Sequence, residues 1–362
     1  MSPPERLGTL LDTDDRTLPI PQVTMAVTDR QTNLALLLLL VAALASGTVL
    51  FALGTRWALA ALITHGVVGL GVVLTTPWKQ RIIRRGLATR SARSTWPSIV
   101  LGVLVVVTVM TGVLHSAGLV RSYGPLDDMQ LHVGAALLAL PFTVWHVVVR
   151  RVRPQRTDVT RRNVLRLGML AGAAGAAFAG LEGVIRLAGL PGADRRFTGS
   201  FEQGSHDPAS MPSIIWLSDP RPDIDESRWQ LRVTDGNGER RLDFADVAGH
   251  HDRLTATIDC TTGWFAEQDW TGVRLARLLT VPDGARSVVV RSTTGYSRRF
   301  PVGDVEHLLL ATGYEGRPLA NRHGFPLRLV APGRRGFWWV KWVTDVETSD
   351  APAWVQPYFP LQ

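Results

Sequence analysis

The first half of the chain is dominated by five apolar stretches of about twenty residues, each with almost no charge. A helix of this length and composition can cross the hydrocarbon core of a bilayer, so each stretch predicts a transmembrane helix. The fifth stretch is only mildly apolar, with Arg166, Glu182 and Arg186 near its ends. The predicted spans are residues 33–53, 57–76, 97–119, 129–149 and 164–187.

The second half alternates short β-rich runs with turn signals. Residues 229–233 and 287–291 are predicted strands, and Asp-Gly-Asn-Gly at 235–238 is a predicted turn. Helical periodicity is confined to short pieces such as residues 273–279. The pattern therefore predicts a multi-domain protein, with an all-α transmembrane helical bundle of five spans followed by an α+β domain over residues 191–362, long enough for a substantial core.

The net charge of +8 is concentrated in two short loops beside predicted spans. Residues 79–93 carry six basic residues and no acid, and residues 150–162 carry six arginines against Asp158 alone. The positive-inside rule makes both loops cytoplasmic, so this charge is a topology signal and predicts no nucleic-acid partner. With five spans crossing the lipid bilayer, the amino terminus is expected in the cytoplasm and the C-terminal domain outside the cell membrane.

Two segments flank the four-helix unit predicted for residues 33–150. Residues 1–32 are polar and rich in Pro and Asp, which predicts a disordered cytoplasmic tail. Residues 151–190 hold the basic loop and the fifth span. Within them, Thr160-Arg161-Arg162-Asn163 and the weakly apolar stretch that follows resemble a twin-arginine signal, which exports proteins already folded around a cofactor. The alternative is a basic loop that only sets topology.

An internal repeat organises the membrane half. Aligning His65 with His132 places Trp78 on Trp145, thirteen residues later in both copies. In the preceding spans, Ser46-Gly47 corresponds to Thr111-Gly112. The repeated unit is a helical hairpin, and two copies predict a four-helix bundle with a pseudo-twofold axis along the membrane normal.

Histidines inside such a bundle call for an explanation, because polar groups in a bilayer are costly. His65 and His132 are repeat mates at similar depth, and two facing histidines are the ligand set of a b-type haem. His146, fourteen residues after His132, lies about four turns along the same helix. It is a candidate ligand for a second haem, although its repeat mate Lys79 is not one. His115 is an alternative haem ligand or a wall of a quinone pocket.

Each of these histidines is, taken alone, equally explained as a hydrogen-bonded packing residue. Together with the repeat, they favour one haem b near the outer face, with His65 and His132 as iron ligands. The membrane half resembles the broad class of four-helix bacterial cytochrome b subunits in its pattern. Such a bundle exchanges electrons with the quinone pool or another membrane electron carrier.

Cys260 is the only cysteine of the chain. A single thiol in the domain predicted outside the membrane cannot form an internal disulfide, and it is open to oxidation unless it is buried or bound. A thiolate suits a transition metal, and coordination protects it. We therefore expect Cys260 to be a metal ligand.

Three motifs in the outer half carry a resemblance. They are Cys260-Thr261-Thr262-Gly263-Trp264, then Trp270-Thr271-Gly272-Val273-Arg274-Leu275, and the run RHGFPLRLVAPGRRGFWWVKW over residues 322–342. In this order they resemble the molybdopterin domain of the sulfite oxidase family. The resemblance implies that Cys260 ligates molybdenum and that His323, Arg328 and Trp339-Val340-Lys341 bind the molybdopterin cofactor. It also implies a catalytic, substrate-side tyrosine, at Tyr296.

The chain departs from that family after the cysteine. Sulfite oxidases place arginines there, whereas residues 261–269 contain no basic residue and include Glu267. Sulfite is therefore a doubtful substrate, and the pattern is nearer to the bacterial branch with the periplasmic methionine sulfoxide reductase catalytic subunit. The resemblance implies oxygen-atom transfer on a small-molecule or protein-side-chain substrate. Two other readings remain open: a molybdoenzyme with a helical anchor but no haem, and a cofactor-free binding module.

Overall fold

The computed structural model describes residues 28–89, 92–124, 126–152, 155, 158–214 and 221–357. Most of the tail predicted for residues 1–32 lies outside these residues. Its last four residues do not belong to a tail, because the first helix begins at Asp29. Thr28 caps this helix: its hydroxyl accepts a hydrogen bond from the amide of Gln31, and the Gln31 side chain accepts one from the amide of Thr28.

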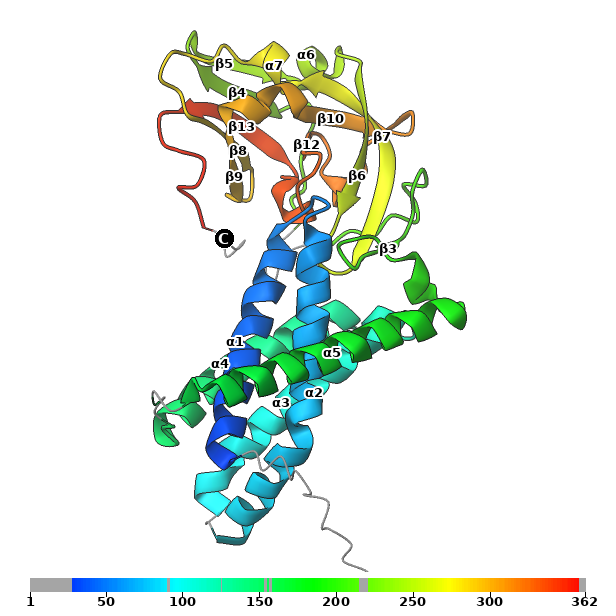
Figure 1. The fold of residues 1–362 in the computed structure, drawn as a ribbon. Helices are drawn as coiled ribbons and strands as arrows, with labels where there is room; N and C mark the ends of the chain where they lie inside the picture. The colour runs from blue at the N-terminus through cyan, green and yellow to red at the C-terminus, as the bar shows by residue number, and fades with distance from the viewer. Residues whose placement is uncertain are drawn as a thin grey trace, which may run out of the picture.

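Five long helices fill the first half and contain the predicted spans almost entirely (Figure 1). All five are long and apolar enough to cross a membrane. Helix α2 continues through Pro77, so much of the basic segment predicted as a loop from residue 79 is helical instead. The helices are α1 (Asp29–Ala52), α2 (Ala58–Thr89), α3 (Ala92–Ala117), α4 (Asp128–Val149) and α5 (Arg161–Leu187).

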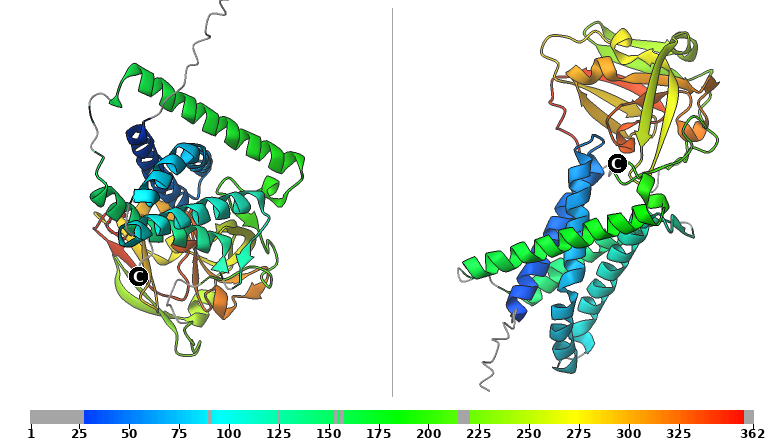
Figure 2. Two further views of the ribbon diagram at one scale, coloured as in Figure 1. Left: turned by 90° about the horizontal axis from the view of Figure 1, so that it is seen from below. Right: turned by 45° about the vertical axis from the view of Figure 1, so that its right-hand side comes forward.

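The first four helices form two hairpins, α1 with α2 and α3 with α4, as the repeat predicts. Helix α5 lies outside these hairpins and crosses α2 obliquely (Figure 2). The close approach requires a glycine, since a Cβ on Gly66 would lie 2.4 Å from the ring of Phe178. A short two-stranded ribbon, β1 (Ser122–Tyr123) and β2 (Leu126–Asp127), joins α3 to α4.

The C-terminal domain is built from two sheets that enclose one hydrophobic core. The first has the order β11-β10-β7-β3, with β12 beside β10 and β6 beside β7; the second has the order β5-β4-β13-β8-β9. The strands of the first sheet are β3 (Phe201–Glu202), β6 (Asp252–Asp259), β7 (Trp264–Arg274), β10 (Leu309–Tyr314), β11 (Arg317–Pro318) and β12 (Arg328–Val330). Those of the second are β4 (Gln230–Asp235), β5 (Gly238–Asp243), β8 (Ser287–Ser292), β9 (Ser297–Pro301) and β13 (Val343–Ser349).

The strands predicted at 229–233 and 287–291 are confirmed as β4 and β8, and the turn at 235–238 joins β4 to β5. The helix predicted for residues 273–279 is largely wrong. Val273 pairs with Leu310 in the sheet, and only α7 (Leu275–Leu278) is helical. Sheet pairing has overridden the local helical pattern there.

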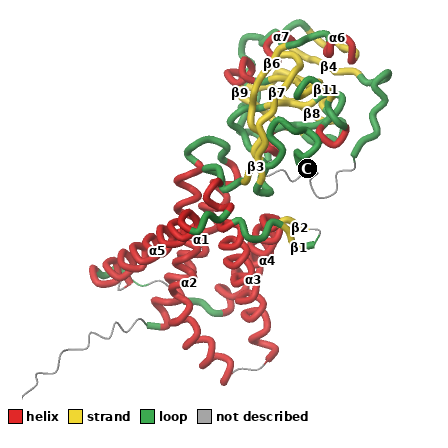
Figure 3. The backbone as a smooth tube through the Cα atoms, turned by 90° about the vertical axis from the view of Figure 1, so that its right-hand side faces the viewer, coloured by secondary structure: helices red, strands yellow, loops and turns green. Residues whose placement is uncertain are grey.

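The hairpin ends that lie nearest the C-terminal domain in Figure 3 contact it. At the α1–α2 tip, Phe51 stacks on Phe337 with ring centroids 5.3 Å apart, and Leu53 forms a β-bridge with Arg334. At the α3–α4 tip, His115 contacts Gly199, in the segment between α5 and β3. The two hairpins thus end against the part of the sheet domain that carries the site described next.

Candidate active site

A cleft of about 120 Å³, partly open to solvent, lies in the C-terminal domain at the side that faces the helices. It gathers residues from segments far apart in the chain. Five of the seven site residues predicted in this domain line it: Cys260, Tyr296, Arg328, Trp339 and Lys341. The apolar part of its wall includes Ile258, Trp264 and Phe337.

Cys260 lies in the tight loop between β6 and β7, half-buried in the cleft. Its amide donates to the carbonyl of Trp264 at 2.8 Å, and its carbonyl accepts from the amide of Gly263 at 3.2 Å. The thiol sulfur lies 3.2 Å from the hydroxyl of Thr262. The backbone of the loop is therefore fixed, while the sulfur faces the cleft beside a single hydroxyl.

Asp259, next to the cysteine, anchors this loop. Its side chain is buried and accepts hydrogen bonds from Thr198 at 2.6 Å, Ser200 at 2.7 Å and Arg335 at 2.5 Å. Arg335 also donates to the carbonyl of Cys260 at 3.0 Å. The sequence analysis missed this anchor, because its partners lie 59 to 76 residues away and no local motif joins them.

Arg328, on β12, is a buried cation in the cleft wall. Its Nη1 donates to the carbonyl of His323 at 2.9 Å, and its guanidinium lies over the rings of Trp270 and Trp339. Its buried Nε has no hydrogen-bond partner in the part of the chain that the structure describes. Burial lowers the pKa of Arg328 to about 10, so it remains charged at neutral pH.

Lys341 is the second cation in the cleft wall, and its side chain is half-buried. Its Nζ donates to the hydroxyl of Ser213 and to the carbonyls of Ile214 and Arg322, each at 3.0 Å. Burial, and then repulsion from Arg328, lower the pKa of Lys341 to about 7. Neither cation pairs with a carboxylate among the described residues.

A buried and a half-buried cation side by side without an acid are costly unless an anion joins them. The phosphate of a molybdopterin would supply that anion, and the neighbouring thiol of Cys260 would supply a metal ligand. The described residues therefore fit the cofactor that the sequence predicted. A bound phosphate would give the buried Nε of Arg328, in the cleft wall, the hydrogen-bond partner that the described residues do not supply.

His323 and Val340 are buried behind the residues that line the cleft, and their role in binding the cofactor stays a prediction. The His323 ring is held by the hydroxyl of Tyr314 at 2.7 Å and the carbonyl of Met211 at 3.1 Å. Burial and the charge of Arg328 lower the pKa of His323 to about 3, so the ring is neutral. The amide of Val340 already donates to the carbonyl of Trp338 at 3.2 Å.

Tyr296 lines the cleft at the predicted substrate side. Its hydroxyl donates to the carbonyl of Phe337 and accepts from Nε of Arg298 at 2.7 Å. Arg298 is buried and lies over the rings of Tyr296, Phe337 and Trp338. The sequence analysis missed Arg298, which fixes the tyrosine from behind.

The repeat histidines meet between the two hairpins, with ring centroids of His65 and His132 5.9 Å apart. Nδ1 of His65 donates to the carbonyl of Ala43 at 3.0 Å, and Nδ1 of His132 donates to the carbonyl of Thr108 at 2.8 Å. Gly47 lies beside the ring of His65 and Gly112 beside the ring of His132. A Cβ added to either glycine would lie 3.1 Å from Cε1 of the neighbouring histidine. The two halves therefore repeat in atomic detail.

His65 and His132 are the pair predicted to ligate haem iron. A backbone carbonyl on one ring nitrogen orients a metal-binding imidazole and leaves the other nitrogen for the metal. Neither Nε2 of this pair has a hydrogen-bond partner among the described residues. Two imidazoles on one metal, with bonds of about 2 Å as at other metal–imidazole sites, place the ring centres roughly 6 Å apart.

The other two histidines lie in different surroundings. Nδ1 of His146 is 3.1 Å from the hydroxyl of Ser98, while its repeat mate Lys79 donates to Asn33 at 2.8 Å. His115 uses both ring nitrogens, with Asp128 at 2.7 Å and the carbonyl of Gly199 at 2.9 Å. Iron ligation needs a free nitrogen, so in this arrangement His115 is a contact between domains and not a haem ligand.

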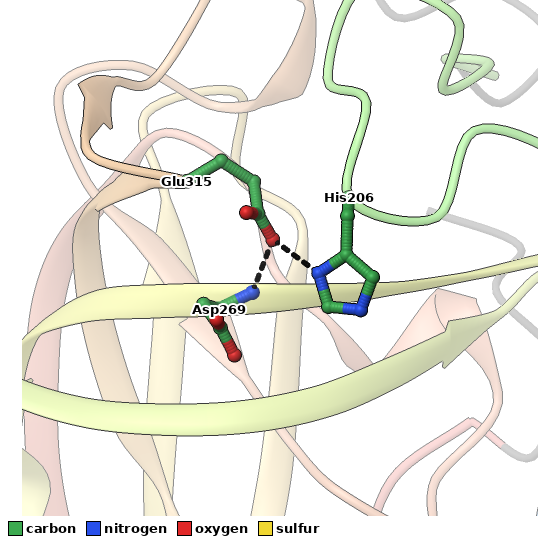
Figure 4. A group of neighbouring side chains, drawn as sticks. All are labelled: His206, Asp269 and Glu315. Atoms are coloured by element: carbon green, nitrogen blue, oxygen red, sulfur yellow. Dashed lines mark hydrogen bonds and ion pairs between the residues drawn. The ribbon is translucent and has the colours of Figure 1, made fainter.

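His206, Asp269 and Glu315 form a separate polar group on the surface of the C-terminal domain (Figure 4). Glu315 accepts from Nδ1 of His206 at 2.9 Å and from the amide of Asp269 at 2.7 Å. The hydrogen bond from Glu315 raises the pKa of His206. These bonds tie the loop of His206 to β7. This structural role is sufficient to explain why the three side chains lie together.

Residues 218–356 match the family model described as oxidoreductase molybdopterin binding domain. The chain is similar to the uncharacterized oxidoreductase YuiH of Bacillus subtilis, with 32% identity over 131 residues, covering 34% of this chain and 66% of that protein. It is 30% identical over 120 residues to the protein-methionine-sulfoxide reductase catalytic subunit MsrP of Xanthomonas campestris, covering 27% of this chain and 37% of that protein. Mitochondrial sulfite oxidase of Drosophila melanogaster is 27% identical over 130 residues, or 31% of this chain and 21% of that protein.

The match covers the segments that carry Cys260, Arg328 and Lys341. The C-terminal domain is therefore a molybdopterin-binding oxidoreductase domain of the sulfite oxidase family. The chain spans two thirds or less of the length of these relatives. The five helices lie outside the matched residues.

Proposed function

We propose that the protein is a membrane-bound molybdenum oxidoreductase. Its C-terminal domain performs oxygen-atom transfer outside the cell membrane and exchanges electrons with the quinone pool through a b-type haem. The carrying observation is that the helices present a fixed histidine pair, with ring centroids 5.9 Å apart, while their outer ends contact the domain of Cys260. Positive loops on the opposite side support this orientation.

The cofactor site divides its tasks among few residues. Cys260 would ligate molybdenum, while Arg328 and Lys341 would hold the pterin phosphate with charge-assisted hydrogen bonds. His323 keeps Arg328 in place through its carbonyl. When bound, the cofactor supplies oxygen-atom transfer, and the protein orients it and shapes the cleft.

The cleft favours a neutral substrate over sulfite. The segment from Thr261 to Asp269 has no basic residue, and the wall beside Cys260 includes apolar side chains such as Ile258, Trp264 and Phe337. A sulfoxide, which is neutral and partly apolar, fits this wall. The name of the Xanthomonas relative, which specifies protein methionine sulfoxide, agrees with such a substrate class.

The proposed reaction requires electrons to pass between the helical half and the C-terminal domain. His65 lies on α2 and His132 on α4, so an iron held by this pair would join the two hairpins. The polar surroundings of His146 and Lys79 lie at the other end of the helices, near the basic segments. The twin-arginine-like sequence at Thr160-Arg161-Arg162 would serve export of the loaded domain. It overlaps the start of α5, which Thr160 caps and whose first residue is Arg161.

Metal analysis tests the proposal on the full-length protein purified from its membrane. We expect molybdenum and iron each near one per chain. His132→Ala should abolish the reduced-haem absorption bands, whereas the control His251→Ala, at an exposed position, should retain them. Unchanged bands in His132→Ala contradict the ligand assignment.

The same measurement separates the alternatives. Molybdenum without iron would reduce the helices to an anchor. A correctly expressed protein that folds without molybdenum would make the C-terminal domain a binding module. Either result overturns the corresponding half of the proposal.

A further inference from the structure

The contact between the α3–α4 hairpin and the C-terminal domain contains buried polar side chains, which simple packing does not require. We propose that His115 and Asp128 form a latch that holds the Cys260 loop against the hairpin carrying His132. The latch comprises His115, Asp128, Gly199 and Gly263. It would keep the molybdenum and haem sites in one fixed arrangement, and this role rests on the function proposed above.

The His115 ring joins the hairpin to the C-terminal domain through Nε2, while Nδ1 bonds within the hairpin. Nδ1 lies 2.7 Å from a carboxylate oxygen of Asp128, and Nε2 lies 2.9 Å from the carbonyl of Gly199. A carboxylate and a carbonyl are both acceptors, so both bonds form when both ring nitrogens carry a proton. The two side chains are buried, with 10% and 5% of their surface exposed. Charge-assisted hydrogen bonds of this kind are stronger than neutral ones.

The ring also reaches the Cys260 loop directly. Gly263 closes that loop with a φ of 92°, and its amide donates to the carbonyl of Cys260 at 3.2 Å. A Cβ at Gly263 would lie 2.8 Å from Cε1 of His115 and 2.9 Å from Cγ of Met129. The carbonyl of Gly263 accepts from the amide of Phe201 at 2.9 Å. Glycine at this position therefore permits both the turn and the approach of the hairpin.

On the helix side, the latch lies one turn from the predicted haem ligand. Asp128 precedes His132 by four residues on α4, so both occupy the same helix face. On α3, His115 follows Thr111 by four residues, and the Thr111 hydroxyl lies 3.4 Å from Nδ1 of His132. The same two helices thus position the haem site and the latch.

The internal repeat supplies a comparison within the chain. With the two hairpins aligned, His115 corresponds to Leu50 and Asp128 corresponds to Ala61. The α1–α2 tip meets the C-terminal domain through apolar and backbone contacts instead, such as Phe51 on Phe337. An apolar tip is therefore sufficient for packing. A buried histidine–carboxylate pair is costly and is best explained by the specific orientation that it imposes.

Hydrogen exchange on the full-length protein tests the latch without reference to activity. Asp128→Asn keeps the side-chain shape but removes the charge, and losing a charge-assisted bond should speed exchange at the Gly263 amide roughly ten- to a hundredfold. His115→Ala should do the same. His251→Ala, at an exposed position, is the matched control and should leave exchange unchanged. Unchanged exchange in both latch variants overturns the proposal.

A second measurement tests the consequence for electron transfer. A photoreduced deazaflavin donates one electron to the oxidised haem, and the haem is re-oxidised as that electron passes to oxidised molybdenum in the same chain. In the wild type this phase should be independent of protein concentration. Asp128→Asn should slow it by about tenfold or more with metal contents unchanged, since a less populated docked state limits transfer.

The outcomes separate the latch from the proposed function. Faster exchange with an unchanged electron-transfer phase shows a purely structural contact and overturns the proposal. Wild-type protein that lacks iron or molybdenum overturns the proposed function instead. In that case the hydrogen-exchange comparison still decides whether the latch holds the Cys260 loop.

Discussion

Lys341→Met is the sharpest test of an anion in the cleft, because its effect on stability should depend on both pH and cofactor. In the cofactor-free protein, burial lowers the pKa of Lys341 from 10.5 to about 7. The unfolded chain then binds more protons than the folded chain between these two values. The free energy of unfolding therefore rises with pH across this window.

The magnitude follows from the pKa. One pKa unit corresponds to 1.36 kcal/mol, and Lys341 is half-protonated near pH 7, so raising the pH to 9 should stabilise the cofactor-free wild type by about 2 kcal/mol. Lys341→Met lacks this gain. For a domain of this size, the Tm difference between the two proteins should change by about 4–8 °C over that interval.

The assay is thermal unfolding of the full-length chain by tryptophan fluorescence between pH 6.5 and 9. Arg228→Met, which removes a cation whose side chain is 88% exposed, is the control and should follow the wild type. In cofactor-loaded protein the phosphate should keep Lys341 protonated, so the pH dependence should disappear. Parallel profiles for wild type and Lys341→Met without cofactor, or the same dependence after loading, would refute the reasoning.

Three further outcomes are expected. Cys260→Ser should lower molybdenum per chain in elemental analysis while circular dichroism stays unchanged, since the loop is held by its backbone and by Asp259; retained molybdenum would contradict the ligand role. His323→Ala should destabilise the domain by about 2–4 kcal/mol in denaturant unfolding at pH 8 through the loss of two buried hydrogen bonds. The loss should be smaller at pH 5, because the ring stays neutral in the folded domain but is protonated in the unfolded chain, which already weakens the wild type there. The raised pKa of His206 makes its bond to Glu315 stabilising below about pH 6.5, and this contribution is lost as pH rises through the folded pKa. Glu315→Gln should lower the NMR titration midpoint of His206, and an unchanged midpoint would exclude Glu315 as the cause.

The five helices, the hairpin repeat and the strands β4 and β8 could be predicted from the sequence. Each depends on a local pattern: twenty apolar residues, thirteen-residue spacing from histidine to tryptophan, or alternation along a short run. The residues lining the cleft could be predicted only through the order of motifs. Cys260, Arg328 and Lys341 were recognised as a set because a family resemblance joined them, not because their spacing revealed proximity.

The helix predicted at residues 273–279 shows where local reasoning ends. Its periodicity is helical, but Val273 and Arg274 complete β7 because β10 offers hydrogen bonds across the sheet. His323 and Val340 carry the expected residue types, yet both lie behind the wall. Whether a side chain faces a cleft depends on the register of its strand or turn, which a motif does not contain.

The sequence by itself determined that the chain has an apolar helical half and a mixed sheet half, because these follow from hydropathy and periodicity. A family resemblance added the prediction of which residues bind a molybdenum cofactor. The tertiary structure alone decided that His115 joins Asp128 and Gly199, and that Asp259 anchors the cysteine loop. These contacts join residues up to 84 positions apart. Their geometry exists only after the two halves fold and dock, since a hydrogen bond requires a distance and a direction that no local pattern encodes.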